Sequence, residues 1–245
     1  MRHAFYKSLK VIDVKRIKII NVDLGGCEGC CVSLFRALPQ ISQFGDFISR
    51  YIVEEDFEIS DADVIFVTGS VCMNDPHAIE LLKEARNKAK ILVALGSCAV
   101  FGGITRFSRG GQMPKPEHRV FSPISRVVTI EYAIPGCPPP PVTVVSFLRF
   151  LITGKEQQLL LFKAVASLEK PLSGFDLLDD VVFSGLCIGC GACTLSCPTQ
   201  ALILIERRPE LIVEKCIRCG TCYVRCPRAS QLLVRRYLEK IKSKS

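Results

Sequence analysis

Short apolar runs alternate with apolar residues at helical spacing along the N-terminal part of the chain. The runs are rich in β-branched residues and end in turns, which is typical of strands; they lie at 16–22, 63–68, 91–95 and 127–134. Helical spacing follows them at 32–38, 76–85 and 142–152. Because ILVAL at 91–95 is apolar throughout, we expect that strand to be buried on both faces of a parallel sheet. The alternation predicts an α/β domain with a doubly wound, flavodoxin-like parallel sheet.

Proline and capping residues mark the ends of two predicted helices. Pro39 is expected to close the first helix, because proline cannot continue the hydrogen-bond ladder. Asn74 or Asp75 can cap the second helix, and Pro76 suits its first turn, where the missing N–H would have no partner in any case.

Four cysteines fall directly after predicted strands, in loops rich in glycine and proline: Cys27, Cys30, Cys98 and Cys137. In an open parallel sheet the loops at the carboxyl ends of the strands lie along one edge, where ligands bind. We therefore expect these four thiolates to converge although they are far apart in the sequence. Four cysteine thiolates are the usual ligand set of a 4Fe-4S cluster, which is the expected occupant.

A second group of cysteines forms two identical runs near the C-terminus. Each run has the spacing CxxCxxCxxxCP, and the second lies 29 positions after the first. In bacterial-type two-cluster ferredoxins the fourth thiolate of each run binds the other cluster. The expected ligands of one 4Fe-4S cluster are Cys187, Cys190, Cys193 and Cys226, and those of the second are Cys216, Cys219, Cys222 and Cys197.

Zinc ribbons and disulfides are the alternatives for these runs. Zinc usually takes two CxxC pairs with a longer spacer, and disulfides would not need two identical four-cysteine runs. The chain begins without the apolar segment of a signal peptide, and no apolar run reaches the 18 or more residues of a spanning helix. We therefore expect a reducing, cytoplasmic location without membrane insertion, and we interpret the cysteines as metal ligands.

The composition is that of a folded protein, with 49% hydrophobic and 23% charged residues in 245. The formal charge of +8 counts every cysteine as neutral. A 4Fe-4S core held by four thiolates carries a net charge of about −2, so three clusters would bring the total to roughly +2. No nucleic-acid-binding motif accompanies the basic residues, and we do not expect a nucleic-acid partner.

Residue composition and the positions of glycine and proline predict four segments. Residues 1–153 would form the sheet domain with its cluster, 154–180 a linker with a short helical pattern, and 181–228 the two-cluster ferredoxin domain. Residues 229–245 are expected to form a basic helix that docks on the ferredoxin domain or on a neighbouring subunit, with Arg235, Arg236 and Lys240 solvated.

At the strand-end cysteines the sequence resembles a known family. GCEGC at 26–30, GSCAVFGG at 96–103 and PGCPPPP at 135–141 are similar to the proximal-cluster motifs of NiFe hydrogenase small subunits and of the homologous 20 kDa-type subunit of complex I. Together with GSVC at 69–72, RFSRGGQ at 106–112 and the ferredoxin tail, they most resemble the gamma subunit of coenzyme F420-reducing hydrogenase. The similarity covers roughly residues 17–228.

This resemblance implies an oxidoreductase subunit that relays electrons through three 4Fe-4S clusters. The nickel-iron centre would lie on a large subunit and an FAD on a further, coenzyme F420-reducing subunit, with both cofactors on partner chains only. No general acid, nucleophile or phosphate-binding loop stands out in this chain, so we expect the bond-making chemistry on its partners.

Several positions are ambiguous. An adjacent pair such as Cys30-Cys31 is the complex I form of the motif, whereas Cys27 with Cys30 is the hydrogenase form; we expect the latter, with Cys31 packed as a small hydrophobe. Cys72 also follows a strand and is expected in the core or beside the cluster. Thr68 occupies a position that is often acidic in hydrogenase relatives, which leaves the partner's hydrogen chemistry open. The histidines show no metal spacing: His3, His77 and His118.

Three alternatives differ from the preferred function. The large subunit could lack nickel, as in the complex I lineage, which its own CxxC motifs would decide. A free electron carrier would be a monodisperse monomer, whereas an isolated subunit would expose its proximal-cluster face and aggregate. A regulatory redox sensor would need an effector or DNA-binding segment, and the sequence shows none.

Overall fold

The computed structural model describes residues 16–50, 52, 57–103 and 120–243. In this part of the chain, five parallel strands form one sheet: β1 (Ile17–Asp23), β2 (Gly45–Ser49), β3 (Ala62–Thr68), β5 (Ala89–Leu95) and β7 (Tyr132–Ile134). Their order across the sheet is β2-β1-β3-β5-β7. Renumbered by strand, this is 2-1-3-4-5, the flavodoxin-like order, so the predicted fold class is confirmed.

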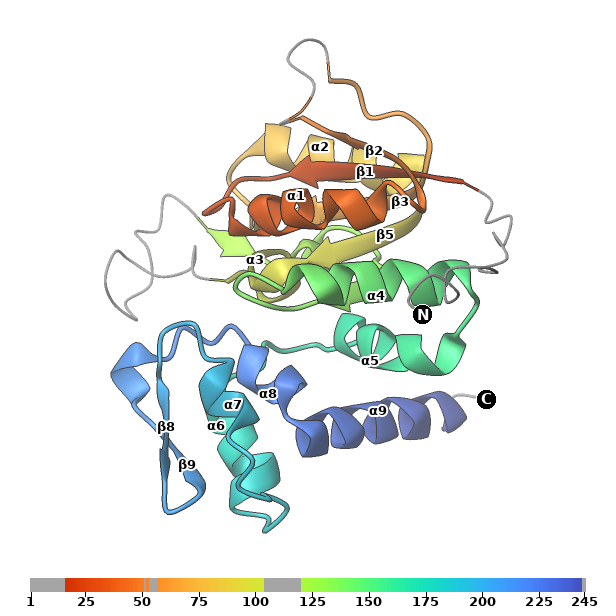
Figure 1. Cartoon of the computed structure of the whole chain (residues 1–245). Helices are drawn as coiled ribbons and strands as arrows, with labels where there is room; N and C mark the ends of the chain where they lie inside the picture. The colour runs from red at the N-terminus through yellow and green to blue at the C-terminus, as the bar shows by residue number, and fades with distance from the viewer. Residues whose placement is uncertain (1–15, 51, 53–56, 104–119, 244–245) are drawn as a thin grey trace, which may run out of the picture.

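Helices cover both faces of the sheet (Figure 1). On one face, α1 (Gly29–Ile41), α4 (Pro141–Ile152) and α5 (Glu156–Ala166) pack on side chains that include Ile19, Phe66 and Tyr132. On the other face, α2 (Pro76–Lys88) and α3 (Gly96–Phe101) pack on Ile20 and Ile65. Adjacent residues such as Ile19 and Ile20 face opposite layers because side chains alternate along a strand. This explains why the strand runs are apolar throughout.

One aromatic side chain anchors the α4 layer. Phe147 is fully buried and meets Phe66 and Tyr132 edge to face, with ring centroids 6.2 Å and 5.2 Å away. Burial of such a side chain contributes about 1.5–3 kcal/mol. Its replacement by alanine would cost about 3–5 kcal/mol, because a cavity would remain under the sheet.

The C-terminal residues form a smaller unit below the sheet (Figure 1). Its elements are α6 (Gly174–Leu177), the π-helical turn η3 (Leu178–Val182), α7 (Ala192–Leu195), the antiparallel pair β8 (Leu202–Ile205) and β9 (Arg208–Leu211), η4 (Val213–Lys215), α8 (Thr221–Arg225) and α9 (Pro227–Lys242). Phe101 of α3 and Tyr223 of α8 belong to the same hydrophobic core. The sheet and the smaller unit are therefore packed together.

The strand predicted at 127–134 is only partly correct. Strand pairing is confined to β7, preceded by the 3-10 turn η2 (Ile124–Arg126). Val127, Val128 and Ile130 are apolar because they pack against the core from irregular backbone. The edge strand β2 was not predicted, because GDFIS is short and carries no clear alternation. A short antiparallel pair, β4 (Val71–Cys72) with β6 (Phe121–Ser122), lies beside the main sheet.

Pro39 does not close the first helix, contrary to the prediction. It lies inside α1, two residues before the end at Ile41. A proline near the C-terminus removes a single helical hydrogen bond, and the Ser42 N–H still donates to the Leu38 carbonyl at 2.9 Å. The second helix begins as predicted. The Asp75 carboxylate accepts hydrogen bonds from the N–H groups of His77 and Ala78, and Pro76 follows it.

The C-terminal helix α9 packs on α5 and α8. Arg236 is not simply solvated, contrary to the prediction: its guanidinium donates two hydrogen bonds of 2.8 Å to the Asp180 carboxylate. Lys240 is also paired, with Glu169 at 2.9 Å. Helix α5, inside the predicted linker, buries Leu159 against the sheet side. Within the described ranges, no helix has the length and apolarity that crossing a membrane requires.

Candidate iron-sulfur sites

The four strand-end cysteines meet at the carboxyl edge of the sheet. Cys27 follows β1, Cys30 lies in the first turn of α1, Cys98 lies in α3 after β5, and Cys137 follows β7. Burial raises the pKa of Cys30 most, followed by the charges of Cys98, Cys27, Cys137 and the adjacent Cys31. The loops themselves are in contact: the Ser97 N–H, beside Cys98, donates to the Gly136 carbonyl, beside Cys137, at 2.8 Å, and a Cβ on Gly96 would lie 2.2 Å from the Cys30 Sγ and 3.7 Å from that carbonyl. The structure thus brings together the cysteines that sequence reasoning grouped.

Two glycines leave room for the sulfurs at this edge. A Cβ on Gly96 would lie 2.2 Å from the Cys30 Sγ, and one on Gly103 would lie 2.4 Å from the Cys98 Sγ. Both glycines also have positive φ, +89° and +50°, which favours glycine. The GSCAVFGG motif is therefore shaped around the sulfurs, as expected if the chain wraps closely around a cluster.

The cysteines of the C-terminal unit line two separate pockets. One pocket is lined by Cys187, Cys190, Cys193 and Cys226, together with Ile188 and Val182. The other is lined by Cys197, Cys216, Cys219 and Cys222, together with Leu202 and Leu211. Each pocket combines three cysteines of one run with the fourth cysteine of the other run. This is the crossed arrangement expected from the repeated spacing.

Left-handed backbone shapes both runs. Gly191 and Gly220 occupy equivalent positions, with φ +72° and +70°, and each begins a short helix. Gly189 has φ +66°, whereas its counterpart in the second run is Arg218 with φ +50°. A non-glycine residue in this region costs of order 1–3 kcal/mol, so the second run holds its turn under strain.

Contacts connect the sheet edge to the pocket that contains Cys216, and that pocket to the one that contains Cys187. Cys137 at the sheet edge has its pKa raised to about 12, mainly by burial and next by the charge of Cys219 in the second run. The pKa of Cys222 is raised by burial, then by its own group, and also by Cys193 of the first run. The Ser97 hydroxyl, beside Cys98, also donates to the Cys219 carbonyl at 2.6 Å, and the two pockets exchange their fourth cysteines. The Cys216 pocket therefore adjoins both other groups.

The raised pKa values of these buried cysteines indicate the protonation state of their thiols. Buried thiols crowded by other thiols stay protonated at neutral pH unless a positive charge compensates them. A cationic iron-sulfur core supplies that charge, and binding releases the protons. The donor set and its electrostatics thus fit 4Fe-4S clusters at all three sites.

Disulfides and single-ion metal sites are the other possible uses of these cysteines. None of the fourteen, all of which the structure describes, is paired in a disulfide. Over the described residues, no three His, Cys, Asp or Glu side chains converge as ligands of a single metal ion. A single zinc ion holds its thiolates at about 2.3 Å, whereas the four thiolates of a 4Fe-4S cube each bind a different iron.

The buried Cys31 thiol contacts polar side chains at the carboxyl edge of the sheet. It is 2% exposed, and its Sγ lies 3.6 Å from the Asn21 Nδ2 and 3.5 Å from the Thr68 Oγ1. The Thr68 hydroxyl donates to the Asp23 carboxylate at 2.6 Å. Burial is the main cause of the raised pKa of Cys31. Cys72 is half-buried in β4.

The structure describes one of the three histidines. His77 lies in the first turn of α2, where its N–H donates to the capping Asp75. His3, His118 and the motif at 106–112 lie outside the described residues.

Sequence reasoning missed groups that contact the candidate ligand cysteines. The Ala201 N–H donates to the Cys197 Sγ at 3.1 Å, and the Cys219 thiol donates to the Thr221 hydroxyl at 3.3 Å. Hydrogen bonds at cluster sulfurs are among the factors that set reduction potentials. The position of Thr221, two residues after the candidate ligand Cys219, could have indicated its contact. The contact of the Ala201 N–H with Cys197 could not be predicted, because it depends on how the folded backbone brings the two residues together.

Sequence comparison identifies two family matches. A family described as NADH ubiquinone oxidoreductase, 20 Kd subunit, matches residues 27–151, which include the four sheet-edge cysteines. A 4Fe-4S dicluster domain family matches residues 176–231, which include both cysteine runs.

Curated relatives share most of the chain. It is 41% identical to the coenzyme F420 hydrogenase subunit gamma of Methanosarcina barkeri, over 80% of this chain and 81% of that protein. It is 33% identical to the subunit of the same name from Methanococcus voltae, over 79% of this chain and 87% of that one. Among solved structures, an NAD+-reducing [NiFe]-hydrogenase chain aligns with a TM-score of 0.46 and 26% identity, over 57% of this chain and 93% of that chain.

Proposed function

The chain belongs to the 20 kDa subunit family of NADH ubiquinone oxidoreductase, and within it to the coenzyme F420 hydrogenase gamma subunits; from this premise we propose that it is the electron-relay subunit of a cytoplasmic NiFe hydrogenase. Its residues would hold three 4Fe-4S clusters between a nickel-iron large subunit and an FAD-containing, coenzyme F420-reducing subunit. The single observation that supports the proposal is the adjacency of three four-cysteine groups: Ser97, beside Cys98, donates to the Cys219 carbonyl at 2.6 Å, and the two pockets of the C-terminal unit exchange their fourth cysteines.

The proposed ligands follow from the three groupings. Cys27, Cys30, Cys98 and Cys137 would hold the proximal cluster, and the two pockets of the C-terminal unit would hold the others, with their fourth ligands exchanged. When bound, each cluster supplies a one-electron store. The chain's own residues would fix the order of the sites and hold their spacing.

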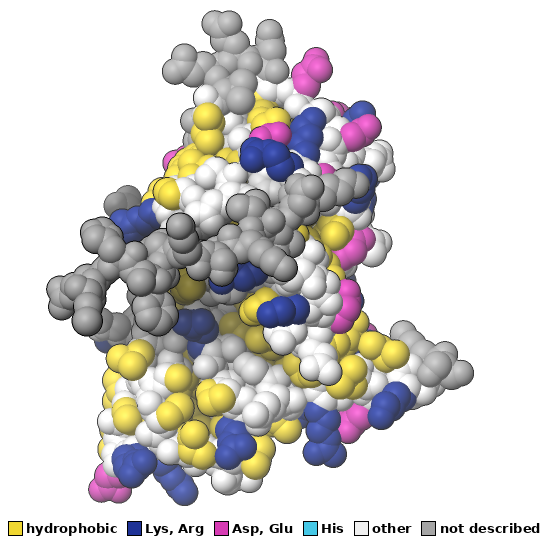
Figure 2. All heavy atoms as spheres, turned by 45° about the vertical axis from the view of Figure 1, so that its right-hand side comes forward, with side chains coloured by type: hydrophobic (Ala, Val, Ile, Leu, Met, Phe, Trp, Pro, Cys, Tyr) yellow, Lys and Arg dark blue, Asp and Glu magenta, His cyan; other side chains and the backbone are white. Residues whose placement is uncertain are grey.

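The two outer sites suit contacts with different partners. At the sheet edge, Cys27 is exposed, so electrons could enter there from a large subunit. At the other end, Cys190 is exposed, and nearby apolar side chains face solvent: Ile188 is 51% exposed and Phe183 75%. Hydrophobic and basic side chains intermix over this lower part of the molecule (Figure 2). We propose that the flavin subunit docks there.

The basic excess supports the same assignment. Four thiolates on each cube leave about −2 per cluster, so three clusters offset most of the formal charge of +8. The basic residues would then neutralise the clusters, which removes the need for a nucleic-acid partner.

The experiment is to purify the assembled complex anaerobically through a tag on this chain and to identify the co-purifying subunits. The proposal predicts a large subunit with two nickel-binding CxxC motifs and bound nickel. It also predicts that hydrogen gas reduces the clusters and then added coenzyme F420. A large subunit without those motifs, or clusters that hydrogen does not reduce, would contradict it and favour the nickel-free relative.

A further inference from the structure

A single hydroxyl group connects the sheet edge to the C-terminal unit. Ser97, next to Cys98, is 1% exposed. Its Oγ donates a 2.6 Å hydrogen bond to the backbone carbonyl of Cys219 and accepts one of 3.1 Å from the Gly136 N–H. The Ser97 N–H in turn donates to the Gly136 carbonyl at 2.8 Å. Ser97 therefore holds the backbone beside three proposed ligands from different parts of the sequence.

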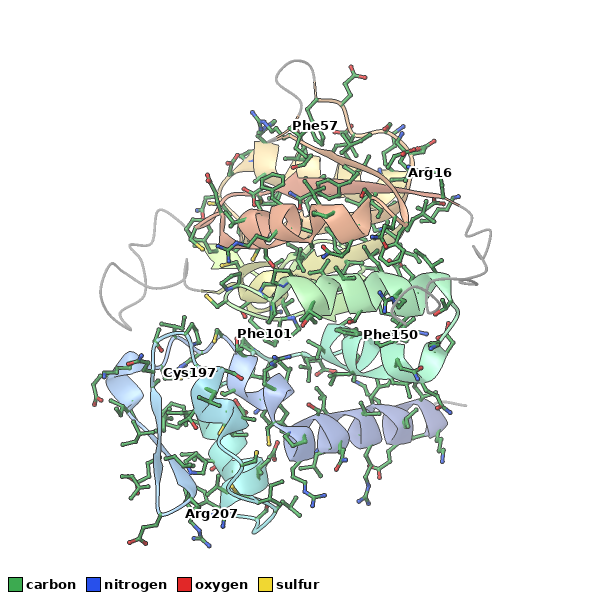
Figure 3. All side chains as sticks on the ribbon, viewed as in Figure 1. Arg16, Phe57, Phe101, Phe150, Cys197 and Arg207 are labelled. Atoms are coloured by element: carbon green, nitrogen blue, oxygen red, sulfur yellow. The ribbon has the colours of Figure 1, made fainter. Side chains whose placement is uncertain are left out.

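Close packing surrounds this hydroxyl. A Cβ on Gly220 would lie 2.4 Å from the Phe101 ring and 3.2 Å from the Leu172 Cβ, so the backbone after Cys219 sits directly on α3. Phe101 lies between the sheet and the unit below it (Figure 3). Packing brings the two parts together but does not by itself fix a rotation, whereas a directional hydrogen bond does.

This contact coincides with the junction between the first two sites. Cys137 follows Gly136, whose N–H and carbonyl both pair with Ser97, and Cys219 supplies the carbonyl that accepts from the Ser97 hydroxyl. The Ser97 hydroxyl thus contacts one peptide group on each side of the gap that an electron must cross.

We propose that Ser97 is a positioning residue for electron transfer, whose hydroxyl holds the Cys219 loop against the Cys137 loop and fixes the separation of the two cubes. The proposal rests on the proposed function, because it presupposes a cube at each site. In the step concerned, one electron passes from the sheet-edge site to the Cys216 site, oxidising the first by one electron and reducing the second by one. No bond is formed or broken, and no proton is transferred.

The test compares three variants of the full chain in the purified complex. Ser97→Ala removes the hydroxyl, and Ser97→Thr retains it. Ser33→Ala is the matched control, because Ser33 is also buried, at 3%, and its hydroxyl donates to the Pro139 carbonyl without reaching the C-terminal unit. Iron content is measured first. The readouts are then the magnetic interaction between neighbouring reduced clusters by EPR, and hydrogen exchange of residues 217–223.

The wild-type complex and Ser33→Ala should show interaction-split EPR signals, and Ser97→Ala should weaken them at unchanged iron content. Exchange of 217–223 should rise about tenfold in Ser97→Ala, which corresponds to about 1.4 kcal/mol and lies within the range for a lost buried hydrogen bond. Ser97→Thr should restore both readouts. If Ser97→Ala loses iron, the complex with Ser97→Thr provides the test. Retained splitting of its EPR signals supports the proposal, and lost splitting overturns it.

Two results separate this inference from the function on which it rests. Wild-type complex with about eight irons per chain, two cubes, would overturn the proposed function itself. About twelve irons with identical EPR and exchange in wild type and Ser97→Ala would overturn only the role of Ser97.

Discussion

At the sheet edge, four cysteines come from loops that are far apart in the sequence, whereas the C-terminal unit takes eight cysteines from two short runs. The first site exists only when β1, β5 and β7 are paired in register, because each strand delivers a different loop. The second and third sites are built by local turns around Gly191 and Gly220. Tertiary structure positions one site, and local backbone conformation positions the other two.

The difference predicts different sensitivities. A change in the sheet or in its edge glycines should affect the proximal site alone. A change in either cysteine run should affect one or both sites of the C-terminal unit, because each pocket borrows its fourth cysteine from the other run. The expected effects below run from the loss of a cluster to a small change in stability.

The largest effect is expected from removing one sheet-edge ligand. Cys98→Ala should lose one cluster, about four of twelve irons, while the spectra of the ferredoxin pair persist, because the sites share no ligand. Cys72→Ala is the control, since Cys72 lies in β4 outside the three groups, and it should keep all its iron. Anaerobic iron and sulfide analysis with EPR measures both. Full iron content in Cys98→Ala would refute the proximal assignment.

The crossed ligands can be tested by matching spectra. Cys197→Ala should lose the same cluster signal as Cys216→Ala, although Cys197 belongs to the other run. Cys226→Ala should likewise match Cys187→Ala. EPR of the reduced variants makes the comparison. If Cys197→Ala instead matched Cys187→Ala, each run would hold its own cluster and the pairing would be wrong.

A smaller effect is expected from the glycine next to the Cys30 sulfur. Gly96→Ala places a Cβ 2.2 Å from that Sγ at φ +89°, and strain plus overpacking should cost roughly 2–6 kcal/mol and reduce proximal-cluster occupancy. Gly154→Ala is the matched control, with φ +64° and nothing within 4 Å; it should cost about 1 kcal/mol and no iron. Iron content and thermal unfolding of the two variants are compared. Equal behaviour would show that Gly96 is required only for its backbone conformation.

The smallest effect concerns the ion pair between α9 and η3. Arg236→Gln should lower stability by about 1 kcal/mol, or a shift of roughly 2–4 °C, because the Arg236 pair is bidentate but half exposed. Arg235→Gln, which breaks only an exposed pair with Glu239, should change little. Thermal unfolding at pH 7 distinguishes them, and equal shifts would argue against a specific role for Arg236.

The pH dependence of this pair has a definite sign. The Arg236 guanidinium holds the pKa of Asp180 below its usual range. Its contribution is therefore complete above the unfolded pKa of about 3.9 and is lost as the pH falls through the lowered folded value. The difference between wild type and Arg236→Gln should shrink below about pH 4. A difference that grew there would contradict this sign.

Sequence patterns predicted most of this architecture because apolar runs and cysteine spacings are local signals. The runs at 63–68 and 91–95 became β3 and β5, and the repeated spacing anticipated both pockets. Prediction was weaker where tertiary packing decides the outcome. Val127 and Val128 are apolar because they pack against the core, although they are not in a strand. Strand β2 forms because it pairs with the outer edge of β1.

The contacts that sequence could not predict join distant segments. Nothing local indicates that the Ser97 hydroxyl reaches the Cys219 carbonyl, or that Arg236 and Tyr223 share Asp180. Such contacts need the relative placement of whole elements, which follows from the packing of α3 on the C-terminal unit and of α9 on α8 and η3 within it. The groups of cysteines were therefore predicted from their spacing, and their role as cluster ligands stays a prediction, while the contacts between the groups required the structure.

The central claim is that strand-end thiolates at the sheet edge hold a third cube next to the pair in the C-terminal unit. Anaerobic iron and acid-labile sulfide analysis of the wild-type chain, purified with its clusters, tests it most directly. We predict about twelve irons and twelve sulfides per chain. About eight of each would contradict the account, because the sheet edge would then hold no cluster.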